Sequence, residues 1–241
     1  MNDISFESLK KFARLSGFFY LIVIAGGLFA EVFVREAMAV SNDAVATANK
    51  IQASEMFYRL GFVADLINLI CGLPVILFFW ILFKRSHKYI VTLAIFSVII
   101  CNAVVATNLS NQLHPLLVYG NANYLQSFQP NQLAVLSPMA LEIQSQGYAI
   151  GLVFFGFYCV IIGYLIYKTE YIPKLLGILY AIAGVSYILN SFIMFLSHGF
   201  SNPLFPYILF PAFIGELSVC MWLLVMGIKE HVAEGTVRLD R

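Results

Sequence analysis

Six long apolar runs divide the chain, and most of its polar residues fall between them or near their ends. Each run is continuous rather than alternating, and a helix needs about 20 such residues to cross roughly 30 Å of hydrocarbon. Only helices satisfy every backbone group internally over that distance. We therefore predict an all-α, polytopic membrane protein, a single domain over residues 1–241, with six transmembrane helices at residues 17–34, 60–83, 89–113, 147–167, 175–196 and 207–228.

The composition agrees with a lipid bilayer as the surroundings of these helices. Of the 241 residues, 61% are hydrophobic and 11% are charged, whereas soluble domains have about 45–50% and about 25%. The net charge of +1 gives no sign of a nucleic-acid partner. The four cysteines lie inside apolar runs without metal-ligand spacing, so we predict that they are small buried hydrophobic residues.

The placement of lysine and arginine predicts the orientation. Basic residues gather in the N-terminal segment, in the KRSHK connection at 84–88, in the connection at 168–174 and in the C-terminal tail. The connections at 114–146 and 197–206 have none. Because positive residues favour the cytoplasmic side, we expect both termini in the cytoplasm. Two long outer loops follow: 41–55, which begins with helix-capping residues and should form a short helix, and 116–140, an aromatic segment with two prolines that should form an ordered cap.

Several polar residues lie within the predicted helices. When their depth is counted at a helical rise of about 1.5 Å per residue, all of them fall in the outer half of the span. Ionisable residues inside a membrane are costly and normally face the bundle interior or a wet cavity. We therefore predict a polar chamber in the outer half of the bundle. Its expected ligand-binding residues are Glu31, Arg35, Asp65, Asn108, Tyr148, Tyr187, Asn190 and Glu216.

Asp65 needs a partner, because it lies within an apolar run. Spacing places it on one helix face with small and amide residues, in a stripe made by Gly61, Asp65, Asn68 and Gly72. Arg59 lies on a different side of that helix, so Arg35 is the better expected partner. Glu31 and Arg35 are spaced for an ion pair within their own helix.

Two outer histidines, His114 and His198, are candidate metal ligands together with Glu142 or Glu216. No HExxH or comparable local motif supports such a site, so a metal is not our main expectation. The sequence identifies no cofactor.

Long stretches of the chain resemble a bacterial family of six-helix integral membrane proteins, the domain of unknown function numbered 4386. The resemblance covers nearly the whole chain and is carried by ARLSGFFYLIVIAGGLFAEVFVRE, YRLGFVADL, GYAIGLVFFGFYCVIIGYLIYKTEYIPKLLGILYAIAGVSYILNSF and PAFIGELSVCMWLLVMG. It implies the fold and a multi-pass place in the bacterial inner membrane, but no activity. Tyr158 stands where many members have histidine and Ala149 where an acid is often found, so a haem or metal site built on that histidine is not expected here.

Three functions remain open at this stage. The favoured one is a binding or transport-like protein whose chamber holds a small polar molecule or a lipid headgroup. The second is a membrane-embedded hydrolase or lipid-modifying enzyme with Asp65 or Glu216 as general base, with or without a metal. The third is a structural or interaction protein whose acids are locked in ion pairs. The expected partners are the lipid bilayer and a lipid or small-molecule ligand, and monomer and oligomer are both compatible with the sequence.

Overall fold

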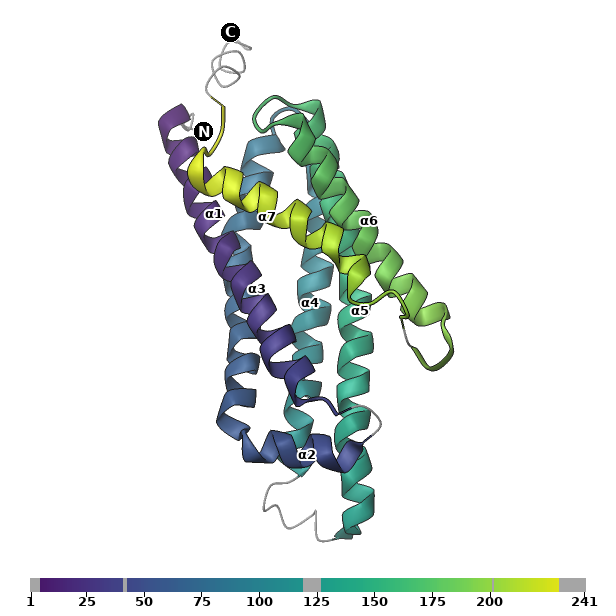
Figure 1. Ribbon diagram of the computed structural model, residues 1–241. Helices are drawn as coiled ribbons and strands as arrows, with labels where there is room; N and C mark the ends of the chain where they lie inside the picture. Colours follow the sequence, from purple (N-terminus) through teal and green to yellow (C-terminus); the bar gives the residue numbers. More distant parts are fainter. Residues whose placement is uncertain (1–4, 41–42, 119–126, 201, 230–241) are drawn as a thin grey trace. The chain divides into compact units, whose positions relative to one another are not determined.

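The computed structural model describes residues 5–40, 43–118, 127–200 and 202–229, and the regular structure within these ranges is helical (Figure 1). The elements in chain order are α1 (Phe6–Leu28), the π-helix η1 (Phe29–Glu36), α2 (Ala44–Ala53), α3 (Glu55–Phe83), α4 (Lys88–Val118), α5 (Pro130–Lys168), α6 (Lys174–Leu196), the short 3₁₀ helices η3 (His198–Phe200) and η4 (Tyr207–Leu209), and α7 (Phe210–Val225).

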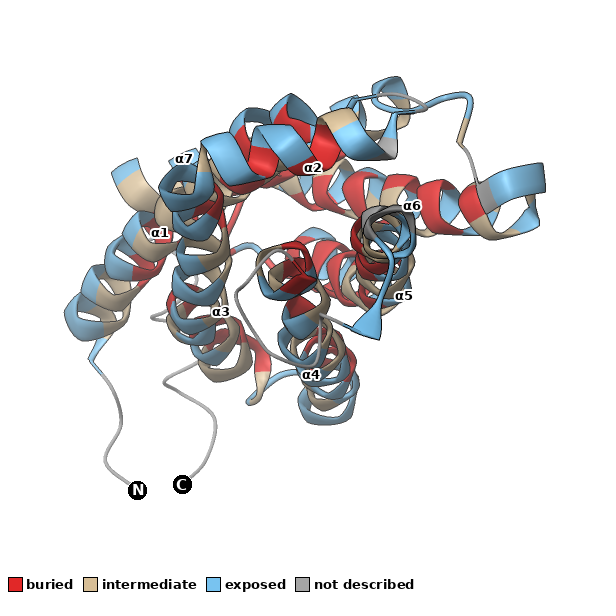
Figure 2. Cartoon of the chain, turned by 90° about the horizontal axis from the view of Figure 1, so that it is seen from below, coloured by how far each residue is buried: buried red, intermediate tan, exposed pale blue. Residues whose placement is uncertain are grey.

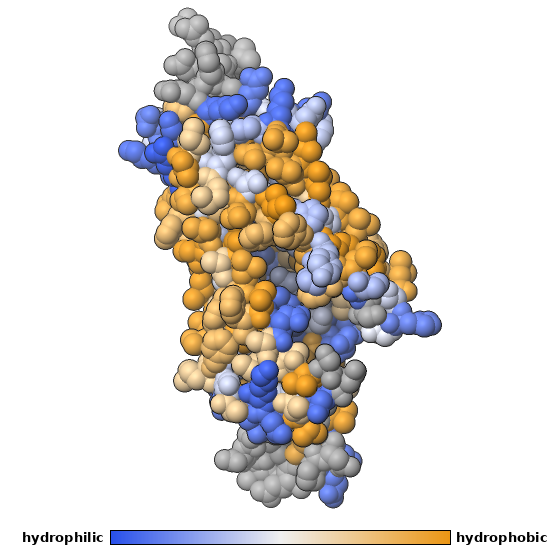
Figure 3. Space-filling view, in the orientation of Figure 1, coloured by the Kyte–Doolittle hydropathy of each residue, from blue (hydrophilic) through white to orange (hydrophobic). Residues whose placement is uncertain are grey.

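Within the described ranges, six helices are long and apolar enough to cross a membrane, which confirms the prediction of six transmembrane helices. They are Phe6–Glu36, Glu55–Phe83, Lys88–Val118, Val135–Lys168, Lys174–Leu196 and Tyr207–Val225. Most extend beyond the predicted runs, because polar residues continue the helix past its apolar part. Large apolar side chains such as Ile70 and Phe96 are exposed. Exposed residues recur along the helices in Figure 2, and apolar side chains cover much of the face in Figure 3. Such a surface suits lipid.

Contacts group the chain into two compact units, which are described separately. Unit 1 consists of Met1–Ile22, Cys71–Cys101 and Gly151–Arg241, and unit 2 consists of Val23–Ile70 and Asn102–Ile150. Helices α1, α3, α4 and α5 each contribute residues to both units. The prediction of a single domain stays a prediction.

In unit 1 the helices approach one another at glycines. A Cβ atom added to Gly163 of α5 would lie 2.6 Å from the carbonyl oxygen of Gly177 and 2.6 Å from the backbone nitrogen of Ala181, both on α6. A Cβ atom on Gly215 of α7 would meet the carbonyl oxygen of Leu179, also on α6. Small residues let membrane helices pack backbone to backbone, as these pairs do. All four cysteines are free and buried, as predicted.

In unit 2 the predicted short helix after residue 41 is confirmed as α2. The side chain of Asp43 accepts a hydrogen bond from the Ala46 amide at 2.8 Å, which caps the first turn. Ile51 of this helix packs into a buried cluster with Val34, Met38 and Tyr58. These contacts order the segment that follows η1.

The connection between α4 and α5 is shorter than the predicted loop over 116–140. Helix α4 continues to Val118 and α5 already begins at Pro130. Proline is favoured at the first position of a helix, because an N–H group there would have no acceptor within the helix. The Gln132 side chain accepts a hydrogen bond from the Gln129 amide at 2.8 Å, which is half of a capping box. Pro130 thus starts a helix instead of interrupting a loop; residues 119–126 lie outside the described part.

Candidate functional site

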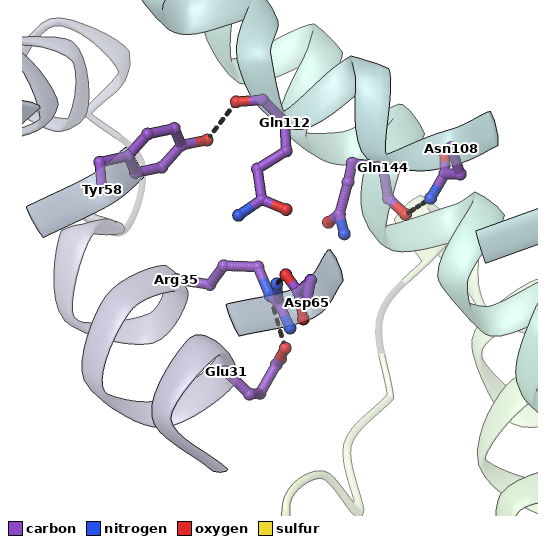
Figure 4. Close-up of polar contacts among 7 residues, drawn as sticks. All are labelled: Glu31, Arg35, Tyr58, Asp65, Asn108, Gln112 and Gln144. Atoms are coloured by element: carbon purple, nitrogen blue, oxygen red, sulfur yellow. Dashed lines mark hydrogen bonds and ion pairs between the residues drawn. The ribbon is translucent and has the colours of Figure 1, made fainter. Parts of the chain in front are cut away.

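An arginine in unit 2 bridges two carboxylates. Arg35 of η1 donates from Nε to Glu31 at 2.7 Å and from its NH1 group to Asp65 of α3 at 2.5 Å (Figure 4). The Arg35 and Asp65 side chains are only 13% and 11% exposed, whereas Glu31 is 39% exposed. Both predicted pairings of Arg35 are confirmed. Arg59 pairs instead with Glu55, one turn away on the exposed side of α3.

The backbone that carries Glu31 and Arg35 is unusual. Phe29–Glu36 is a π-helix that continues α1 without a break. Its apolar residues Ala30 and Val34 are fully buried, and Gly61 of α3 lies directly against Val34. π-Helical turns are rare and occur frequently at functional sites. The close approach of α3 at Gly61 brings Asp65, one turn further along, next to Arg35.

Two buried glutamines lie beside this cluster. Tyr58 donates its hydroxyl proton to the backbone oxygen of Gln112 at 2.7 Å, and Asn108 donates from Nδ2 to the backbone oxygen of Gln144 at 2.6 Å. Both bonds engage the glutamine backbones, so they leave the side-chain amides available. Figure 4 shows the amides of Gln112 and Gln144 pointing toward the Arg35–Asp65 pair.

The Gln112 side chain is the most informative of these groups. Gln112 is 0% exposed. Its amide lies close to the Asp65 carboxylate, yet neither Nε2 nor Oε1 has a hydrogen bond of normal geometry to another described residue. A buried polar group without a partner is uncommon and has a free-energy cost. We refer to Glu31, Arg35, Asp65 and Gln112 as the Arg35 cluster. The centre of the Tyr148 ring lies 5.9 Å from the Arg35 guanidinium carbon, which is within the range of a cation–π contact.

Unit 1 contains a separate carboxylate network around Glu216 of α7. Glu216 is buried, and its oxygens accept hydrogen bonds from the hydroxyl groups of Tyr20 at 3.1 Å and Tyr187 at 2.5 Å. The hydroxyl groups of Tyr20 and Tyr180 are 3.0 Å apart. Both carboxylate oxygens thus have partners from α1 and α6.

The other predicted site residues have different surroundings. Asn190 accepts a hydrogen bond from Asn202 at 2.7 Å, which ties α6 to the segment that follows it. His114 lies on α4 in unit 2, and His198 lies in η3 in unit 1. Within the described ranges, no three His, Cys, Asp or Glu side chains come together as a metal site would need.

The eight predicted ligand-binding residues therefore fall into two groups. The group in unit 2 consists of Glu31, Arg35, Asp65 and Tyr148, and Asn108 bonds to the backbone beside them. The group in unit 1 consists of Tyr187 and Glu216, and Asn190 lies elsewhere on α6. Sequence reasoning missed Gln112. Its spacing of four residues from Asn108 on one helix face was the available signal.

These features define a polytopic α-helical membrane protein with ionisable residues inside its spans. The chain belongs to the family described as a domain of unknown function (DUF4386), with a match over residues 15–227. The resemblance seen in the sequence is thereby confirmed. A protein of Archaeoglobus fulgidus, described as an uncharacterized protein, is 31% identical over 141 residues, which cover 56% of this chain and 82% of the relative. No solved structure matches the chain.

Proposed function

We propose that this membrane protein binds a small polar molecule or a lipid headgroup at the Arg35 cluster. In this proposal both termini are cytoplasmic and the cluster lies in the outer half of a bacterial inner membrane. Charged residues within transmembrane helices are costly and usually mark a ligand or ion pathway. The cluster contains three of them in two spanning helices, and two are nearly buried.

The observation that carries the proposal is the buried Gln112 amide, which lies beside a charged cluster and has no hydrogen bond of normal geometry to a described residue. Ion pairs alone suit a structural role, because opposite charges in contact stabilise each other. A fully buried amide that lies close to Asp65 and still has no hydrogen bond of normal geometry to a described residue is different. A bound polar group would supply the missing partners, since an amide offers two donors and an acceptor.

The experiment is to identify what accompanies the purified protein. Wild-type protein and two variants, Asp65→Asn and Glu55→Gln, are purified in a mild detergent and analysed by native mass spectrometry. Glu55→Gln is the matched control, because it removes an acid of the same helix whose ion pair is about half exposed. We expect an adduct on the wild type and on Glu55→Gln that is lost from folded Asp65→Asn. Loss of the adduct from both variants, or from neither, would contradict the proposal.

A structural role is the second candidate, and the Glu216 network favours it for that residue. Both oxygens of Glu216 accept hydrogen bonds from tyrosines of neighbouring helices, so the group holds α7 to α1 and α6. If the whole protein were structural, Asp65→Asn would lower its stability and change nothing else. An adduct that depends on Asp65 in a folded protein separates the two.

A further inference from the structure

We propose that the ligand of the Arg35 cluster binds through a positively charged primary amine with an oxygen acceptor close by, as in ethanolamine and its phosphate esters. This inference rests on the proposed binding function and adds the chemical class of the ligand. The charges of unit 2 and the donors and acceptors of the Arg35 cluster support it.

The charges favour a cation. Glu31 and Asp65 carry two negative charges against the single positive charge of Arg35, so the cluster is negative by one charge. Its surroundings share that sign: unit 2 contains six acidic and three basic residues, a formal net charge of −3, in a chain whose total is +1. Charge of one sign on low-dielectric walls concentrates ligands of the opposite sign.

The acceptors also favour an amine. Each carboxylate uses one oxygen for Arg35, and a carboxylate accepts about four hydrogen bonds, so both retain acceptor capacity. Glu31 remains 39% exposed, which leaves it within reach of an incoming group. The Gln112 Oε1 atom is a further acceptor, and no described residue donates a hydrogen bond to it. An ammonium group has three donors and no acceptor, which matches this set.

The Gln112 Nε2 group sets a second requirement. It is a buried donor beside the Asp65 carboxylate, without a hydrogen bond of normal geometry to a described residue, and an ammonium group cannot satisfy it. An acceptor oxygen close to the amine of the ligand would give it such a bond. Ethanolamine and an aminophospholipid headgroup both have this arrangement, whereas a quaternary ammonium has the charge but no N–H donor.

An anionic ligand fits less well. Arg35 is the only basic residue of the Arg35 cluster, and two of its donor groups already bind carboxylates. A phosphate or carboxylate would have to displace one of these acids or bind beside both. The cluster thus discriminates against anions by repulsion as well as by occupied donors.

The test compares probes that differ in one property each. The protein is reconstituted in phosphatidylcholine nanodiscs, and phosphatidylethanolamine or phosphatidylglycerol is added in competition, with bound lipid read by native mass spectrometry. Free ethanolamine and free choline are tested separately by thermal shift. We expect phosphatidylethanolamine or ethanolamine to bind about tenfold more tightly than its choline or glycerol counterpart, because hydrogen bonds to charged groups contribute differences of this order. Binding of the lipid alone identifies a headgroup site, and binding of free ethanolamine identifies a small-amine site.

Two variants and one control locate the effect. Asp65→Asn neutralises the cluster and should abolish the preference for the amine. Gln112→Leu removes Nε2 and Oε1 with little change in volume, so it should fail to bind the amine. Glu55→Gln should behave as the wild type.

The outcomes separate the two proposals. Phosphatidylglycerol bound as tightly as phosphatidylethanolamine, with binding lost in Arg35→Gln, would keep the binding function and overturn the amine. Equal binding of choline and ethanolamine compounds would also overturn it. Absence of binding by every probe, in a protein that also purifies without an adduct, would overturn both proposals.

Discussion

Replacement of Arg35 by glutamine should destabilise the protein more than any neighbouring charge change. The substitution leaves Glu31 and Asp65 without the cation that both contact. Removal of one partner from a buried ion pair costs about 3–5 kcal/mol, and we take the lower end because Glu31 is 39% exposed. For a domain of 150–250 residues, each kcal/mol lowers Tm by about 2–4 °C, so about 3 kcal/mol corresponds to roughly 6–12 °C.

Asp65→Asn should have a much smaller effect, although it alters the same ion pair. It leaves the neutral Glu31–Arg35 pair in place, and the asparagine oxygen still accepts from Arg35. The loss is the difference between a charged and a neutral hydrogen bond, about 1 kcal/mol, or roughly 2–4 °C. Arg59→Gln is the control, because half-exposed pairs such as Arg59–Glu55 contribute only about 0–1 kcal/mol.

The assay is the loss of monodisperse protein on heating, followed by fluorescence size-exclusion chromatography of fusions to a fluorescent protein in detergent. The expected order of Tm is wild type, Arg59→Gln, Asp65→Asn and last Arg35→Gln. The reasoning is refuted if Asp65→Asn falls as far as Arg35→Gln, because the charge count would then not govern stability. It is also refuted if Arg35→Gln is no worse than Arg59→Gln.

Three further predictions concern the packing, the Glu216 network and the orientation. Gly163→Ala should destabilise by about 1–3 kcal/mol through overpacking, whereas Gly72→Ala, whose added Cβ meets no atom within 4 Å, should be neutral or slightly stabilising in the same heating assay. Glu216→Gln should lower stability by about 1–3 kcal/mol, because one tyrosine hydroxyl then faces an amide donor; an unchanged Tm would count against the structural role of that network. A thiol introduced as Ser86→Cys should be shielded from a membrane-impermeant maleimide in intact cells, and one introduced as Gln52→Cys should react. The four native cysteines are buried, so they should add little background labelling. The reverse pattern would contradict the proposed orientation.

The sequence predicted the Arg35 pairings because they depend on regular helical spacing and on charge. Glu31 and Arg35 are four residues apart, and Asp65 had no better cation at a similar depth. The six spans were predictable for a similar reason: an apolar run of sufficient length has one stable solution in a bilayer. Only their ends shifted, because helices continue into polar sequence.

The π-helix at Phe29–Glu36 could not be predicted in this way. Apolar residues spaced by four fit an α-helix as well as a π-helix, so the pattern does not separate the two. The start of α5 at Pro130 could not be predicted from the proline alone, because proline breaks the interior of a helix but is favoured at its first position. Gln112 was missed because a polar residue near the end of a span normally faces water, and its burial depends on tertiary contacts.

An experimental structure of the protein purified without added ligand tests the central claim most directly. We expect non-protein density within hydrogen-bonding distance of the Gln112 amide and of the Asp65 carboxylate, with Arg35 still bridging Asp65 and Glu31. A Gln112 amide that is fully hydrogen-bonded to protein side chains, with no density beside Asp65, would contradict it.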